Sequence, residues 1–145
     1  MELENEIKIL RELINNAREN SELLINGFYN EFLSEESFRK LFDKKTVPNR
    51  SDFAHFKIDL NNNHIGILNE ILDKEGEKFI LDIAHFAIKS SDGFSAISYD
   101  GLSSLYINKS HFSSELNPLT EYNDDDIVIE FQNKLNDNGF FNWNG

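Results

Sequence analysis

Two histidines occupy the same position in a sequence that occurs twice, and they are the first residues to consider for chemistry. Residues 52–58 (DFAHFKI) and 82–88 (DIAHFAI) match at five of seven positions, including His55 and His85. If both copies are strands, these histidines share one face of a sheet, where they could bind a metal ion or transfer protons. The aspartate of each copy would point to the opposite face. We therefore favour a structural interpretation, in which two similar strands fill one core.

Three consecutive carboxylates, at Asp124, Asp125 and Asp126, are the second group suited to chemistry. Divalent cations bind carboxylate oxygens, but three consecutive residues of regular structure cannot all face one ion. Acidic residues also stabilise the N-terminus of a helix, by about 0.3 to 1 kcal/mol each. We expect the run to cap a helix, keep protein binding as the alternative, and predict neither a metal site nor a cofactor.

The sequence lacks the motifs of common enzymes. It has no glycine-rich phosphate loop, no His-Glu-x-x-His, no Gly-x-Ser-x-Gly and no cysteine. Two distant carboxylates could act together, but 26 acidic residues give no basis for choosing a pair. We therefore predict no catalytic residue.

The negative charge is concentrated in the last quarter of the chain. Residues 110–145 hold seven acidic residues and one lysine, whereas residues 1–50 hold ten acidic and eight basic residues. A surface of one sign attracts partners of the opposite sign and repels polyanions. We expect a basic protein as the partner, and neither nucleic acid nor an anionic membrane. The expected contact residues are Glu115, Glu121, Asp124, Asp125, Asp126, Glu130 and Trp143.

Size and composition indicate one folded domain over residues 1–145. A chain of this length buries about two thirds of the surface that it exposes when unfolded. A hydrophobic fraction of 39% with thirteen phenylalanines favours a packed core. The start is acidic, unlike a secretory signal, and no apolar stretch has the length of a membrane span. We expect a soluble cytoplasmic protein that is a monomer or a weak dimer.

Residues 1–45 have the apolar spacing of helices. The spacing predicts helices over residues 2–18 and 21–33, and a short third helix after an N-cap at Ser34. The buried stripe of the first helix consists of Leu3, Ile7, Leu10, Ile14 and Ala17.

From residue 52 to 108 the apolar period changes to two, which is typical of strands. Short links between successive strands predict an antiparallel meander. Residues 63–76 also fit a helix with Asn63 as its N-cap and Gly76 at its end, and we leave this alternative open. The five expected strands cover residues 53–60, 64–72, 77–89, 94–99 and 102–108.

A C-terminal helix is expected over residues 123–138, with the acidic run at its start. The order of helices, a five-stranded antiparallel meander and a C-terminal helix is an α+β fold, with helices covering one face of the sheet. The aromatic residues after this helix either anchor a partner or fold back over an end of the sheet. They are Phe140, Phe141 and Trp143.

A compact acidic domain without catalytic motifs resembles, in general character, the immunity proteins that bacteria make to neutralise cognate toxins. The resemblance implies a cytoplasmic inhibitor that binds the cationic active-site cleft of its toxin, for which a nuclease is the expected example. A nuclease presents lysine and arginine to phosphates, and carboxylates can occupy the same cleft.

The expected order of elements also resembles the cone-shaped fold of nuclear-transport-factor-2-like proteins, which often hold a pocket between helix and sheet. This alternative implies a small-molecule-binding protein or an enzyme. Its polar candidates are His55, Asp82, His85 and Tyr99. An apolar cavity with converging polar groups would distinguish it from the immunity protein.

Overall fold

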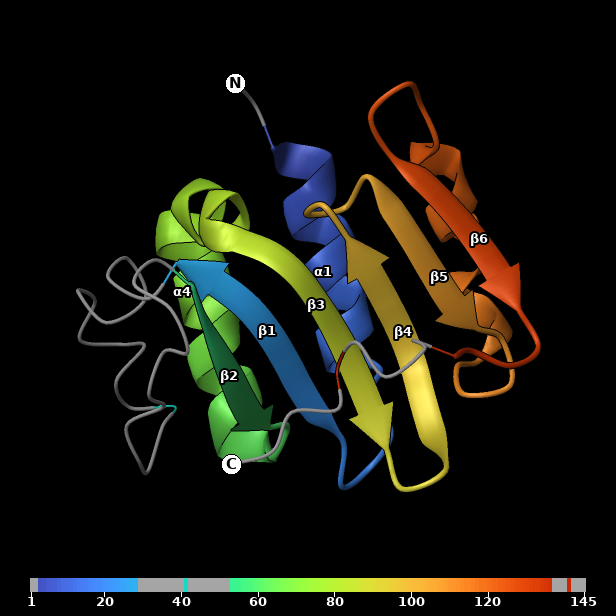
Figure 1. The fold of residues 1–145 in the computed structure, drawn as a ribbon, viewed down its shortest axis with the longest axis horizontal. Coiled ribbons are helices and arrows are strands. Elements are labelled where there is room, and N and C mark those ends of the chain that lie inside the picture. Colours follow the sequence, from blue (N-terminus) through green and yellow to red (C-terminus); the bar gives the residue numbers. More distant parts are fainter. Residues whose placement is uncertain (1–2, 29–40, 42–52, 137–140, 142–145) are drawn as a thin grey trace.

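The computed structural model describes residues 3–28, 41, 53–136 and 141, which form an α+β fold built on a six-stranded mixed sheet (Figure 1). The α+β class expected from the sequence is confirmed, but the sheet is neither five-stranded nor wholly antiparallel. The helices are α1 (Glu4–Asn15), α4 (Asn62–Asp82) and the 3-10 helix η1 (Ser114–Tyr122). The strands are β1 (Glu22–Phe28), β2 (Phe53–Asp59), β3 (Ile83–Ser90), β4 (Gly93–Tyr99), β5 (Ser104–Asn108) and β6 (Val128–Gln132).

The helix expected over residues 21–33 is wrong, because residues 22–28 form the strand β1. This strand lies between β2 and β3 and pairs with both in antiparallel fashion. Its Leu23, Leu24 and Ile25 are all buried, since both faces of the sheet are covered here. Such a continuous apolar run matches a helical stripe as well as a buried strand. The short helix expected after Ser34 lies outside the described residues, apart from Leu41.

The strand expected over residues 64–72 is also wrong, and the helical alternative is correct. The helix α4 begins after Asn61, whose side-chain oxygen accepts a hydrogen bond from the backbone N–H of His64 at 2.8 Å. It continues past Gly76 to Asp82, so the first part of the strand expected over residues 77–89 is helical. The backbone at Glu75 leaves helical geometry, with φ −140° and ψ 35°, which kinks α4 just before Gly76.

The C-terminal helix expected over residues 123–138 is wrong as well. Residues 128–132 form β6, which pairs in parallel with β5 and adds a sixth strand at the edge of the sheet. Ile129 and Phe131 lie on the same face as the helices, as the alternation of a strand requires. The parallel pairing needs a crossover connection, and this connection contains η1.

The repeated sequence lies on both sides of β1. In the strand order β2-β1-β3-β4-β5-β6, Asn26 is paired with His55 on one side and with His85 on the other. Ile25 is likewise paired with Phe56 and Phe86, so the two copies have the same register relative to the central strand from Glu22 to Asn26. At Gly27 a bulge shifts the pairing with β3, so that Gly27 faces Ala54 in one copy and Ile83 in the other. The repeat therefore reflects two similar neighbours of one buried strand, as the structural interpretation expects.

Each face of the sheet has its own apolar cluster. Helices α1 and α4 pack on one face through residues such as Leu10 and Leu68. The opposite, outer face carries Leu24 and Ala87, against which Phe141 of the C-terminal tail is buried. The described part of the tail thus covers the sheet, and Trp143 lies outside the described residues. No helix of the described ranges has the length and apolar character needed to cross a membrane.

Candidate partner-binding groove

The acidic residues expected to bind a partner are all exposed where the structure describes them. Glu115 and Glu121 lie on η1, and Glu130 lies on β6. Asp124, Asp125 and Asp126 form the turn that leads into β6. The structure describes three ion pairs, Lys8–Glu4, Arg11–Asp73 and Arg18–Asp92, and none of them uses these acidic residues. Their charges therefore face solvent.

The turn before β6 is held by its own side chains rather than by a helix. One carboxylate oxygen of Asp124 accepts hydrogen bonds from the backbone N–H groups of Asp126 at 2.7 Å and Ile127 at 2.8 Å. The amide oxygen of Asn123 accepts another from the backbone N–H of Ile129. Asp124 therefore fixes a turn, where the sequence predicted a helix cap.

A groove of about 630 Å³ opens between this turn, the start of α1, the end of α4 and the β4–β5 loop. Four acidic residues line it, Glu6, Asp100, Asp124 and Asp126, and the described part of the lining holds no lysine, arginine or histidine. We call this hollow the acidic groove. Its apolar lining consists of Leu3, Ile80, Leu81, Ile83, Ala84, Leu102 and Ile127.

The environment of Glu6 shows that the acids of the groove act on one another. Burial raises the pKa of the Glu6 carboxyl above its usual value, and a hydrogen bond from its own backbone opposes this rise. The negative charges of Asp124 and Asp126 raise the pKa of Glu6 further. A cation in the acidic groove would stabilise the ionised Glu6 and so offset both the repulsion and part of the cost of its burial.

The β4–β5 loop brings Asp100 to the groove in a defined conformation. Asp100 and Gly101 both have positive φ, 54° and 71°, which suits the Asp-Gly dipeptide. The strands pair at Tyr99 and Ser104, so the loop holds four residues rather than two. The backbone N–H of Asp100 donates to Nδ1 of His85 at 2.9 Å, and that of Gly101 donates to the carbonyl of Ala84 at 2.7 Å. His85 therefore positions this loop.

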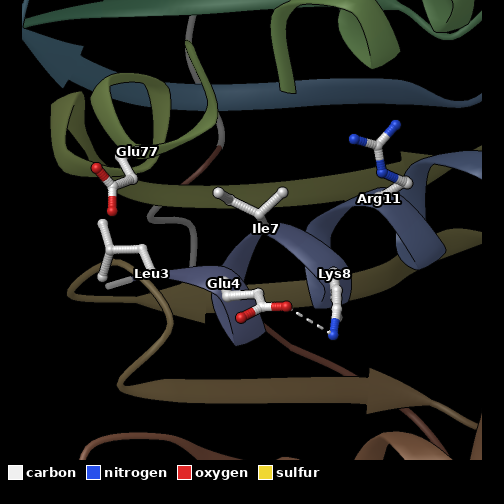
Figure 2. A pocket seen from close by; sticks show the side chains of 6 residues that line it. All are labelled: Leu3, Glu4, Ile7, Lys8, Arg11 and Glu77. Atoms are coloured by element: carbon white, nitrogen blue, oxygen red, sulfur yellow. Dashed lines mark ion pairs between the residues drawn. The ribbon is translucent and has the colours of Figure 1, made fainter. Parts of the chain in front are cut away.

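A second hollow of about 360 Å³ lies between α1 and α4 and shares Leu3 with the acidic groove (Figure 2). Figure 2 shows Glu4 and Lys8 side by side on α1, joined by an ion pair of 3.1 Å. Arg11 of the same hollow pairs with Asp73. The remaining charged residue of its lining is Glu77. Positive and negative charges are balanced here, whereas the acidic groove has one sign.

The surroundings of His55, His85 and His111 indicate structural roles. His55 and His85 flank Asn26, and burial lowers the pKa of His55 below its usual value. His111 shares a hydrogen bond of 2.7 Å with the hydroxyl of Ser95, but Ser95 is fully buried and so cannot meet a substrate. Within the described residues, no three histidine or acidic side chains are grouped closely enough to hold a metal ion.

The small-molecule alternative named four polar residues, His55, Asp82, His85 and Tyr99. In the described part of the chain, none of them lines the acidic groove or the second hollow. The ring of Tyr99 packs against that of His85 and near that of Phe141, with centroid separations of 5.9 and 6.4 Å. These side chains thus help to cover the outer face.

Comparisons of the chain with models of protein families, with curated proteins and with solved structures found no match. The functional argument therefore depends on the geometry of the acidic groove. Sequence reasoning found Asp124 and Asp126 but missed Glu6, Leu81 and Asp100, which only tertiary structure brings together with them.

Proposed function

We propose that the protein is an inhibitor of the immunity type, which binds a cognate basic protein toxin and blocks its active-site cleft. The expected toxin is a nuclease domain, because such an enzyme must present lysine and arginine to phosphates. The observation that carries the proposal is the acidic groove. Glu6, Asp100, Asp124 and Asp126 line it together with apolar side chains, and its described lining holds no cationic side chain.

The surface outside the groove supports the same partner. Glu115, Glu121, Asp125 and Glu130 are exposed, and the ion pairs of the described residues leave them to solvent. A surface of one sign accelerates encounter with a basic protein and disfavours other partners. It also repels nucleic acid. Because the inhibitor and a nucleic-acid substrate are both negatively charged, they would compete for the same cationic cleft of the toxin.

The test is capture followed by an activity measurement. The tagged protein is incubated with the product of the adjacent open reading frame and with the native cytoplasm, and captured proteins are identified. We expect a basic protein whose nuclease or other toxic activity falls in a one-to-one complex. The proposal fails if the captured partner is acidic or neutral, or if a basic partner remains fully active when bound.

A further inference from the structure

We infer that the acidic groove binds a segment of the basic partner in which one large apolar side chain is flanked by lysine or arginine. This inference rests on the proposed function, which supplies a basic partner. It adds where on the protein that partner binds and which of its side chains are recognised. The apolar side chain would enter the floor of the groove, and the flanking cations would pair with the carboxylates around it.

Leu81, at the end of α4, is the exposed apolar residue of the groove. It is 59% exposed, and the other large apolar residue of comparable exposure in the described ranges is Val128, at 54%. Leaving such a side chain in water costs free energy that a partner's apolar group recovers on contact. Leu3, Leu102 and Ile127 also line the groove, although each of them is largely buried.

The charges decide which partner fits. The described lining of the groove has four carboxylates and no cationic side chain. The second hollow has a similar apolar floor, formed by Leu3 and Ile7, but its Lys8 and Arg11 are already paired with Glu4 and Asp73. Of the two hollows, the acidic groove therefore offers a basic segment the larger gain of Coulomb energy. An apolar segment without charge would leave these carboxylates partly desolvated and unpaired.

A metal ion fits less well than a basic segment. Asp124 uses one carboxylate oxygen to hold its own turn, with hydrogen bonds to the backbone of Asp126 and Ile127. No group of three suitable ligands is close enough to hold an ion in the described part of the chain. Interfaces with a central apolar anchor and surrounding polar contacts, by contrast, match the composition of this groove.

The test uses capped pentapeptides as probes, so it does not depend on identifying the toxin. The peptides are RRFRR, RRSRR and EEFEE, and the full chain labelled with nitrogen-15 is titrated with each while amide chemical shifts are followed. We expect RRFRR to bind at least fivefold more tightly than RRSRR, with EEFEE showing no binding. The largest shifts should fall at Leu81, Gly101 and Asp126.

The substitution Leu81→Gln should reduce the affinity for RRFRR to that for RRSRR, because it removes the apolar contact and keeps every charge. Val128→Thr is the matched control, since it changes an equally exposed apolar residue that does not line the groove, and it should leave the affinity within twofold. Equal affinities for RRFRR and RRSRR overturn the inference. Shifts centred on Glu115 and Glu121 overturn it too, as does unchanged binding by Leu81→Gln.

The two proposals can fail separately. If a basic toxin is captured but RRFRR shows no preference for the groove, the inhibitor proposal stands and the groove inference falls. If RRFRR binds the groove as expected and no basic toxin is captured, the recognition chemistry stands and the inhibitor proposal falls.

Discussion

Glu6 and Asp124 come from opposite ends of the chain and lie on the same groove, where the charge of Asp124 contributes to the raised pKa of Glu6. Burial is the largest cause of this shift, and the charge of Asp126 adds to it. Acidic groups whose surroundings disfavour their ionisation are a feature of binding sites, because a partner of opposite charge offsets the cost of ionisation. The ionised Glu6 therefore lowers the stability of the free protein but favours the binding of a cationic partner.

The first prediction concerns the stability cost of Glu6. A carboxyl whose pKa is higher in the folded than in the unfolded state stabilises the fold when protonated, and this contribution is lost as the pH rises through the folded pKa. The substitution Glu6→Gln should therefore raise the free energy of unfolding at pH 7. It should raise it less near pH 4. Urea denaturation at both pH values measures this, with Glu70→Gln on exposed α4 surface as the control for lost charge. An equal effect of both substitutions would argue against the coupling.

The second prediction separates the turn from the charge. Asp124→Asn keeps a side-chain oxygen that accepts the two backbone hydrogen bonds, whereas Asp124→Ala removes it. We expect Asp124→Ala to lower the free energy of unfolding by about 1 kcal/mol, as for the loss of a typical hydrogen bond. Asp124→Asn should have less than half this effect. If the two substitutions destabilise equally, the turn does not depend on these hydrogen bonds.

The third prediction concerns the close approach of α1 and α4. A β-carbon added at Gly76 would lie 2.7 Å from Cδ1 of Ile7, which is shorter than any normal contact. The end of the Ile7 side chain must move to make room, so Gly76→Ala should lose at least part of the roughly 1 kcal/mol that alanine gains over glycine in a helix. Ile7→Val removes Cδ1 and should reduce this cost in the double variant. Gly66→Ala is the control, since nothing lies within 4 Å of its added carbon. Thermal denaturation of Gly76→Ala, Ile7→Val, their double variant and Gly66→Ala measures these effects. Equal changes in melting temperature for the two glycine substitutions would disprove the packing argument.

The fourth prediction concerns His111. Burial lowers the pKa of His111 below 6.5, the charge of Arg18 lowers it further, and Asp92 acts in the opposite direction. A histidine with a lowered folded pKa contributes stability that is present above the unfolded pKa and lost as the pH falls through the folded pKa. The free energy of unfolding should therefore decline as the pH falls below about 6.5.

This decline should be smaller in His111→Gln, because glutamine does not titrate. His55, whose pKa burial also lowers, should retain its own share of the decline. Ser95→Ala is the control, since it removes the hydrogen-bond partner and keeps the imidazole. Denaturation between pH 7.5 and 5 would refute the assignment if His111→Gln kept the full pH dependence.

The sequence predicted the class of the fold and the strands near residues 53–60, 94–99 and 102–108, but it assigned β1 and β6 to helices and residues 64–72 to a strand. The run Leu23-Leu24-Ile25 is compatible with a helical stripe, and only its place between β2 and β3 explains why every residue is apolar. The prediction of a helix over residues 123–138 failed for a related reason. An aspartate caps a helix and fixes a turn through the same side-chain-to-backbone hydrogen bonds, so Asp124 fits both.

The site could be predicted only in part. The exposure of the acidic residues from Glu115 to Glu130 follows from their hydrophilic character, and the structure agrees. The acidic groove required the placement of α1, the end of α4 and the β4–β5 loop around one turn. Leu81 had no signal of its own, because the sequence placed it within a strand, where an exposed leucine is unremarkable.

The most direct test of the proposed function is the salt dependence of affinity for the captured basic partner. The triple substitution Asp124→Asn, Asp125→Asn and Asp126→Asn is compared with Glu19→Gln, Asp59→Asn and Glu70→Gln, which removes three exposed acids outside the groove. Isothermal titration at low and moderate salt gives both affinities. We predict that the first variant binds at least tenfold more weakly at low salt and loses most of its salt dependence, while the second changes less than threefold. Equal affinities of the two variants at both salt concentrations would contradict the account.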